Sequence, residues 1–156
     1  MLSLVLPSYN EARRIAASLA ACAEFLGERG LGAEIIVADD GSTDHTGEAF
    51  ADAVATLPQG RLSYRYLPLP HRGKGSAVRA GVGSATGDPI VFLDADLTIP
   101  VDIIDNFLRA IDEGADIAIA SRYVPGSVVR RPWWRRFLGD ASRDERTIAF
   151  ARSLSR

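Results

Sequence analysis

The chain has 156 residues, of which 47% are hydrophobic and 24% are charged, and its net charge is −2. This length suits one domain with its own core, and the composition excludes a disordered, collagenous or coiled-coil protein. The single cysteine excludes an internal disulfide framework and favours a reducing compartment, so we expect a soluble, cytoplasmic protein. No run approaches the roughly 18 apolar residues of a membrane span, and Pro7 ends the apolar start too early for a signal peptide.

The first half of the chain predicts strands and helices in alternation. An apolar run bounded by Pro7 predicts a buried strand at Leu2–Leu6, and Glu34–Ala38 predicts a second strand. A helix with apolar residues on one face is expected after each strand. The first helix is expected to be capped by Asn10 and to end near Gly27 or Gly30. The second is expected to be capped by Ser42 or Thr43 and to end near Ala55.

The second half continues the alternation. Apolar and polar residues alternate over Arg61–Leu67, which predicts a half-exposed strand, and a short helix is expected at Ser76–Ala85. A fourth strand at Ile90–Leu93, an amphipathic helix at Val101–Glu113 and a fifth strand at Asp116–Ala120 follow. This order predicts an α/β fold, in which helices cover both faces of a mostly parallel sheet.

Charge is distributed unevenly along the chain. Residues 1–120 carry 9 Lys and Arg against 17 Asp and Glu, whereas residues 121–156 carry 9 Arg against 3 acids. An acidic body argues against general nucleic-acid binding, which needs a broad basic face. The basic end leaves room for local phosphate binding.

Polar or glycine-rich residues follow every predicted strand. In a doubly wound sheet, ligands bind beyond the carboxyl ends of the strands. One such turn is ordinary loop chemistry, but five at one edge predict a binding site. The five runs are Pro7–Glu11, Asp39–Asp44, His71–Gly75, Asp94–Asp96 and Ser121–Tyr123.

The acidic runs have two interpretations each. Asp94 and Asp96 suit a hard cation such as Mg²⁺ or Mn²⁺, or they form a solvated turn that caps the next helix. Asp39 and Asp40 can likewise cap a helix or accept hydrogen bonds from a base and a ribose. The loop Arg72–Gly75 suits a phosphate, although it lacks the P-loop spacing.

The histidines and the cysteine receive no role in this interpretation. We expect His71 and His45 to be loop and surface residues, and Cys22 to lie in the core. With so few such residues, neither a Ser/His/Asp set nor a Cys/His metal site can be assembled.

The ordered set of motifs resembles family 2 glycosyltransferases, which have the GT-A fold. The residues that carry the resemblance are Pro7–Glu11, Asp39–Asp44, Arg72–Gly75 and Leu93–Asp96. Ser121–Tyr123 and Pro132–Arg136 are similar to the branch that glycosylates polyprenyl (dolichyl) phosphates. The resemblance covers about residues 2–138. It implies a nucleotide-sugar-binding and catalytic domain at 1–138, followed by an irregular basic tail at 139–156 that is shortened relative to the family.

The resemblance implies a metal-dependent, inverting transfer of a hexose from UDP-glucose or GDP-mannose to a polyprenyl phosphate. Asp94 and Asp96 would bind Mg²⁺ or Mn²⁺, and together with Arg122 and Arg136 they are the implied catalytic residues. Thr98 stands where related enzymes often have Gln. The residues implied in substrate binding are Pro7, Tyr9, Glu11, Asp39, Asp40, Arg72, Lys74, Ala95 and Arg135.

Three questions stay open at this point. The Arg72–Gly75 loop, followed by Ala77-Val78-Arg79, resembles enzymes that transfer glucose and so favours UDP-glucose as the donor. GDP-mannose is the alternative donor. Trp133 and Trp134, flanked by arginines, suit either a peripheral contact with the cytoplasmic membrane face or packing into the core. The alternatives to a transferase are a truncated, non-catalytic nucleotide-sugar-binding domain and another phosphate-binding α/β enzyme.

Overall fold

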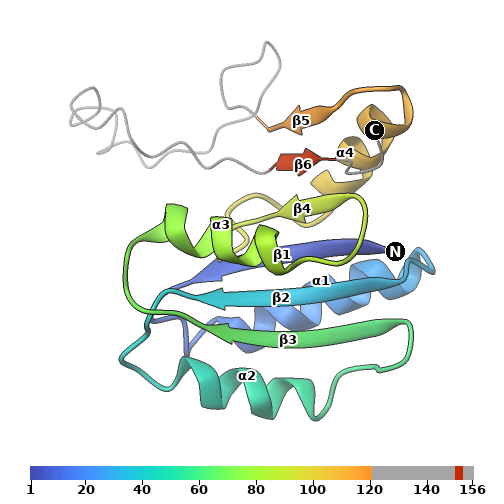
Figure 1. Ribbon diagram of the computed structural model, residues 1–156. Coiled ribbons are helices and arrows are strands. Elements are labelled where there is room, and N and C mark those ends of the chain that lie inside the picture. Colours follow the sequence, from blue (N-terminus) through green and yellow to red (C-terminus); the bar gives the residue numbers. More distant parts are fainter. Residues whose placement is uncertain (121–149, 153–156) are drawn as a thin grey trace, which may run out of the picture.

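A computed structural model describes residues 1–120 and the backbone of 150–152. These residues form one sheet with the strand order β3-β2-β1-β4-β6-β5 and helices on both faces (Figure 1). The elements are β1 (Leu2–Ser8), α1 (Ile15–Glu28), β2 (Ala33–Asp39), α2 (Thr46–Val54), β3 (Leu62–Pro68), α3 (Lys74–Ser84), β4 (Ile90–Phe92), α4 (Ile103–Asp112), β5 (Ile117–Ile119) and β6 (Phe150–Arg152).

The sheet is mostly parallel, as the alternation of strands and helices predicted. Strand β1 pairs in parallel with β2 on one side and β4 on the other, and β2 pairs in parallel with β3. Strand β6 is antiparallel to both of its neighbours, β4 and β5. All five predicted strands are present, and β1 extends to Ser8 instead of ending at Leu6.

Strand β6 corrects one expectation. Residues 139–156 were expected to form an irregular tail, but 150–152 form a strand between β4 and β5. A strand this short has no recognisable periodicity, and its backbone is ordered by hydrogen bonds to neighbours that lie far away in the sequence. The rest of that segment lies outside the described residues.

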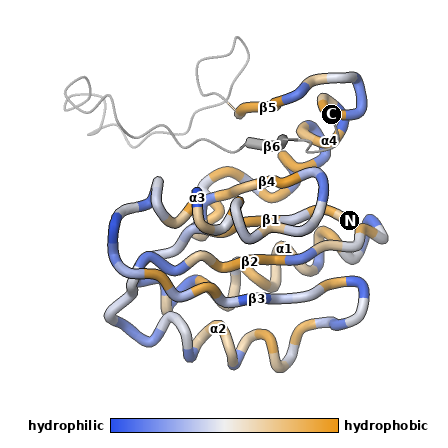
Figure 2. The backbone as a smooth tube through the Cα atoms, viewed as in Figure 1, coloured by the Kyte–Doolittle hydropathy of each residue, from blue (hydrophilic) through white to orange (hydrophobic). Residues whose placement is uncertain are grey.

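The core is divided by the sheet into two layers. Leu4 and Leu6 of β1 pack on the face covered by α1, α2 and α4, whereas Val5 faces α3. Strands β1 and β2 are buried along their whole length, which explains why their central residues are apolar. Much of β1, β2 and β4 is correspondingly hydrophobic in Figure 2. The edge strand β3 is half exposed, as predicted.

The predicted helix caps at Asn10, Ser42 and Thr43 are wrong. Helix α1 begins at Ile15 and α2 at Thr46, and none of the three residues caps them. Asn10 has a φ of 55° and its Oδ1 accepts a hydrogen bond of 2.8 Å from the Thr43 backbone N–H. Its own N–H donates to Ser42 Oγ at 2.8 Å. These polar groups join the loops after β1 and β2 to each other, so they are not available to cap a helix.

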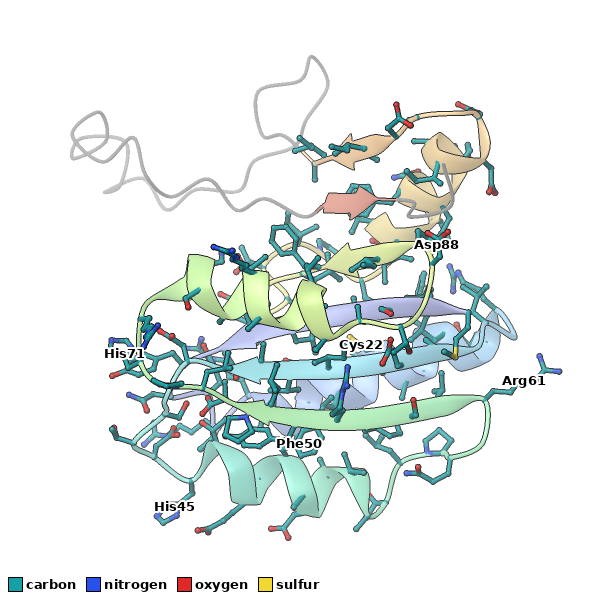
Figure 3. All side chains as sticks on the ribbon, in the orientation of Figure 1. Cys22, His45, Phe50, Arg61, His71 and Asp88 are labelled. Atoms are coloured by element: carbon teal, nitrogen blue, oxygen red, sulfur yellow. The ribbon has the colours of Figure 1, made fainter. Side chains whose placement is uncertain are left out.

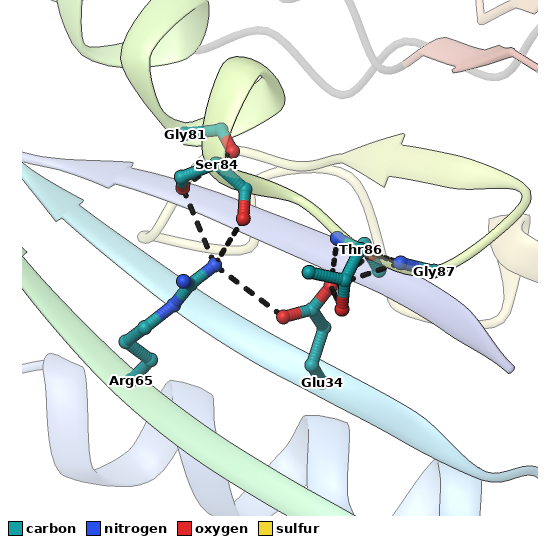
Figure 4. A network of polar contacts seen from close by, with 7 residues as sticks. Glu34, Arg65, Gly81, Ser84, Thr86 and Gly87 are labelled. Carbon is teal, nitrogen blue, oxygen red and sulfur yellow. Dashed lines mark hydrogen bonds and ion pairs between the residues drawn. The ribbon is translucent and has the colours of Figure 1, made fainter. Parts of the chain in front are cut away.

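A buried polar cluster secures the far end of α3. Glu34 Oε1 accepts hydrogen bonds from Ser3 Oγ at 2.5 Å and from the Gly87 N–H at 3.0 Å, and Glu34 also pairs with Arg65 (Figure 4). Arg65 in turn donates to the carbonyl of Ser84, the last residue of α3, at 2.5 Å. Burial raises the pKa of Glu34, but the hydrogen bonds from Ser3, Thr86 and Gly87 outweigh it, so that the pKa is lowered.

Candidate active site

The carboxyl ends of β1, β2 and β4 meet the beginning of α3 at a pocket of about 370 Å³. Four of the five predicted loops contribute to its walls, and the fifth lies outside the described residues. Figure 3 shows His71 of the third loop at this edge. The pocket is lined by Pro7, Ser8, Tyr9, Glu11, Asp40, His71, Gly73, Lys74, Ala77, Asp94, Ala95 and Asp96.

The wall formed by the first two loops is held by hydrogen bonds between them. The backbone N–H of Glu11 donates to Thr46 Oγ1 at 2.9 Å, and that of Ala12 donates to Asp44 Oδ2 at 3.1 Å. The Thr46 hydroxyl, which donates to Asp44, is the main cause of a lowered pKa at that carboxyl. These bonds, with those of Asn10, make the two loops one preorganised unit.

Asp39 and Asp40 differ in position although both are buried. Asp39 lies beside the pocket without lining it, and accepts hydrogen bonds from the Ser42 N–H at 3.0 Å and Ser8 Oγ at 3.3 Å. Asp40 lines the pocket, but its carboxylate accepts the backbone N–H groups of Arg72 at 2.9 Å and Gly73 at 2.8 Å. Asp40 therefore anchors the loop that leads into α3.

The electrostatics of Asp40 follow from this anchoring. Burial raises the pKa of the carboxyl, but the two backbone N–H groups and His71 lower it by more, so the net pKa is below its usual range. His71 Nδ1 lies 2.8 Å from Asp40 Oδ2. The carboxylate thus stays ionised and bound to the loop.

His71, to which the sequence analysis gave no role, is part of the pocket wall. Its ring stacks on that of Tyr9 with a centroid distance of 4.4 Å and an interplanar angle of 25°. Tyr9 is 44% exposed. The pair presents flat aromatic surface of the kind that binds a nucleobase. The available signal was the position of His71 directly before the Arg-Gly-Lys-Gly loop.

Asp94 and Asp96 both reach the pocket from the turn after β4. The Leu97 N–H donates to the Asp94 carbonyl at 2.9 Å, and Leu97 has a φ of 47°, which makes the turn tight. Asp96 Oδ1 accepts the Thr98 N–H at 2.9 Å. Asp94 Oδ1 lies 2.5 Å from Lys74 Nζ.

The chemistry of this turn fits a hard divalent cation. Within the described residues, no group of three or more His, Cys, Asp or Glu is arranged to hold a metal by itself. Mg²⁺ and Mn²⁺ are commonly held by one or two carboxylates and complete their shell with substrate phosphates and water. Asp94 and Asp96 supply such a pair.

A buried serine that the sequence analysis did not consider positions the turn. Ser18 of α1 donates from Oγ to the Ala95 carbonyl at 2.5 Å. Ala95 is the residue between the two aspartates, so this bond fixes their backbone to α1. The contact joins residues 77 positions apart, and a serine within a helical pattern gives no sign of it.

Glu11 is the fourth carboxylate that lines the pocket, beside Asp40, Asp94 and Asp96. Burial is the main cause of its raised pKa, and the charges of Asp96 and Asp44 raise it further, while Arg14 opposes them. Glu11 Oε2 lies 3.4 Å from Arg14 Nη1. The effect of Asp96 on Glu11 shows that negative charge accumulates on this side of the pocket.

The other residues named in the sequence analysis lie in three different places. The Arg72 backbone bonds to Asp40, but Arg72 does not line the pocket. Cys22 is buried, as expected, and burial raises its pKa to about 12. The residues that lie outside the described part of the chain are Arg122, Trp133, Trp134, Arg135 and Arg136.

Comparison with known proteins identifies similar sequences and structures. A sequence model of "Glycosyl transferase family 2" matches residues 3–154. A dolichol-phosphate mannosyltransferase of Pyrococcus furiosus is 36% identical over 87% of this chain and 37% of its own length. A polyprenol monophosphomannose synthase of Mycolicibacterium smegmatis is 35% identical over 86% of this chain and 50% of its own. The chain thus spans half or less of these relatives' lengths.

A solved structure resembles the fold. It is the mannosyltransferase PcManGT of Pyrobaculum calidifontis in complex with GDP-Man and Mn²⁺. The match has a TM-score of 0.59 and 27% sequence identity, and it covers 74% of this chain and 34% of that one.

Proposed function

The chain belongs to glycosyl transferase family 2, and from this premise we propose that it transfers a hexose from a nucleotide sugar to a polyprenyl phosphate. The GT-A fold implied by the motifs agrees with the glycosyltransferase structure it resembles. One observation carries the proposal: Asp94, Asp96 and Lys74 share a pocket with the aromatic pair Tyr9–His71. The pocket thus combines a surface for a base with groups for a diphosphate.

The donor would lie across the pocket in a defined direction. The base would contact the Tyr9–His71 end, with Pro7, Glu11 and Asp40 around it. The diphosphate would lie near Lys74, where α3 begins, because the positive end of a helix dipole favours phosphate. The names of both curated relatives and the GDP-Man bound in PcManGT favour GDP-mannose over UDP-glucose.

The pair Asp94 and Asp96 would hold Mg²⁺ or Mn²⁺. When bound, the ion supplies positive charge that stabilises the negative charge developing on the leaving diphosphate. The Mn²⁺ in PcManGT supports a divalent ion at this fold. The residues of this chain position that charge: Ser18 holds the turn, and Lys74 adds a further cation.

The acceptor needs little activation by the protein. A phosphate monoester is already an anion near neutral pH, because its second pKa is about 6, so no strong general base is required. Attack on the sugar carbon opposite the leaving diphosphate would invert that carbon. We propose Arg122 and Arg136 as partners of the phosphates, with Arg135 in substrate binding.

The acceptor is a lipid, so we propose peripheral contact with the membrane through Trp133, Trp134 and the arginines around them. Indole rings favour the headgroup level, and arginines favour anionic lipid. Among the helices formed by the described residues, none has the length and apolarity required to cross a bilayer.

A donor panel tests the proposal. Thermal unfolding is measured with GDP-mannose, UDP-glucose and other nucleotide sugars, each with Mn²⁺ or with EDTA. Transfer is then measured with a donor whose sugar is radiolabelled, as the appearance of label in a polyprenyl-phosphate product. We expect one donor at 100 times its Kd to add about 2.7 kcal/mol of stability, only with metal. Stabilisation without lipid-linked product would indicate a nucleotide-sugar-binding domain, and a folded protein that no donor stabilises would contradict the proposal.

A further inference from the structure

We propose that Lys74 occupies the cation position at Asp94 while no metal is bound, and that metal binding releases its ammonium group toward the donor diphosphate. Lys74 Nζ lies 2.5 Å from Asp94 Oδ1, which makes it an internal counter-ion of the acidic pair. The inference deepens the proposed function and rests on Asp94 and Asp96 being the metal ligands.

The two partners differ in mobility. The side chain of Asp94 is 18% exposed and that of Lys74 is 53% exposed. The backbone beside Lys74 is fixed, because Gly73 donates its N–H to the buried Asp40. The movable part is therefore the exposed lysine chain, and the rest of the site can keep its geometry during an exchange.

A metal and the ammonium compete for the same oxygen. Mg²⁺ sits about 2.0–2.1 Å from a carboxylate oxygen, and an ammonium held at 2.5 Å from Asp94 Oδ1 occupies that space. Two cations a few ångströms apart also repel each other. A metal bound at Asp94 Oδ1 consequently displaces the lysine.

The released lysine has a second position in the same pocket. Lys74 is the first residue of α3, and Gly73, Lys74 and Ala77 of this helix start all line the pocket. A diphosphate there would meet both the helix dipole and the ammonium. Metal binding would thus prepare Lys74 for the donor, which predicts that metal and donor bind cooperatively.

The sequence makes a direct test possible, because Lys74 is the only lysine in the chain. Protein grown with ¹³C-lysine gives side-chain NMR signals from one residue. We expect the Lys74 signals of the metal-free wild type to differ from those of Asp94→Asn, and Mg²⁺ to move the wild-type signals toward the Asp94→Asn position. Identical metal-free signals, or wild-type signals that Mg²⁺ leaves in place, would overturn the proposal.

A second test measures metal affinity without donor. Mn²⁺ binding is measured by electron paramagnetic resonance. We expect Lys74→Met to bind Mn²⁺ about fivefold more tightly than the wild type, the size expected for competition from a partly exposed ion pair. The matched control is Arg79→Met, which removes a positive charge from an exposed position of the same helix. It should leave the Mn²⁺ affinity unchanged. Equal or weaker Mn²⁺ binding by Lys74→Met contradicts the exchange.

The exchange at Lys74 and the proposed function can fail separately. If a donor with Mn²⁺ stabilises the wild type while the Lys74 signals stay in place, the exchange is wrong and the proposed function stands. If neither Mn²⁺ nor a donor binds, both are wrong.

Discussion

Helix α3 is held at its two ends by two acidic clusters that differ in character. At the amino edge of the sheet, Glu34 is almost fully buried and its Oε1 accepts hydrogen bonds from Ser3, Thr86 and Gly87 (Figure 4). At the carboxyl edge, Asp40 anchors the start of α3 in a similar way. Beside it, however, Asp94 and Asp96 face a cavity, and Asp94 pairs with an exposed lysine.

The comparison separates acids that hold the fold from acids that are left for a ligand. In the described residues, no buried side-chain nitrogen or oxygen lacks a hydrogen-bond partner, so the buried polar side chains are all hydrogen-bonded within the protein. At the pocket, by contrast, the pKa of Glu11 is raised, mainly by burial and further by the charge of Asp96. A carboxyl with a raised pKa in a pocket is typical of functional sites.

The largest effect is expected from Asp96→Ala. Loss of one of the two proposed metal ligands should abolish metal-dependent donor stabilisation and lower transfer on the order of 10²-fold or more. The melting temperature without ligand should change little, because the carboxylate is exposed, and the lost hydrogen bond from the Thr98 N–H is offset by relief of repulsion with Glu11. Calorimetric titration with donor and Mn²⁺ measures the loss, and unchanged donor affinity would contradict the metal assignment.

At the opposite edge, Glu34→Ala should act on the fold. Removing this buried carboxylate breaks the ion pair with Arg65 and leaves the Ser3 hydroxyl and the Thr86 and Gly87 N–H groups without their acceptor, so we expect a loss of about 3 kcal/mol of unfolding free energy. Chemical denaturation measures it. The control is Glu48→Ala, at an exposed position where the glutamate pairs with His45, and it should change stability little. A Glu34→Ala protein as stable as the control would remove the contrast between the edges.

Two buried hydroxyls give a matched pair of smaller changes. Ser3 and Ser18 each donate a 2.5 Å hydrogen bond, one to Glu34 and the other to the Ala95 carbonyl. Each replacement by alanine should cost about 1 kcal/mol of stability. Only Ser18→Ala should also weaken metal-dependent donor binding, by about fivefold, because only Ser18 positions the Asp94–Asp96 turn. Equal donor affinities for the two variants would show that Ser18 is merely structural.

The pH dependence of stability is the finest test. The folded-state pKa of Glu34 is lowered, so its stabilising contribution is complete above the unfolded-state pKa of about 4.3 and is lost as the pH falls through the folded value. Glu34→Gln should therefore be less stable than the wild type near pH 7, with a gap that narrows in acid. Urea unfolding at several pH values measures this gap. A constant gap would mean that the ionised carboxylate is not what stabilises this edge.

Part of the site could be predicted from the sequence, because the topology of the sheet brings its loops together at one edge. Parallel strands end at one edge, so loops that follow β1, β2, β3 and β4 must come together there. Tyr9, Glu11, Asp40, Lys74, Asp94 and Asp96 were predicted in this way, and all line the pocket. The structure shows where these residues lie, and their chemical roles remain predictions.

The helix starts show where reading the sequence fails. Asn10 and Ser42 have side chains that favour both helix caps and loop bonds, and local sequence cannot decide between them. The structure uses them to join two loops. His71 was set aside for the same reason, because its stacking on Tyr9 and its contact with Asp40 are both long-range.

The amino-acid sequence by itself determined the alternation of strands and helices, the mostly parallel sheet and the loops that follow its strands. Hydrophobic periodicity and the succession of elements along the chain are local properties, and a regular alternation of strands and helices favours parallel pairing. Only the tertiary structure decided that 150–152 insert between β4 and β5, that Ser18 holds the Asp94–Asp96 turn and that Lys74 pairs with Asp94. These contacts join distant positions, and their energy exists only once the sheet has brought both partners together.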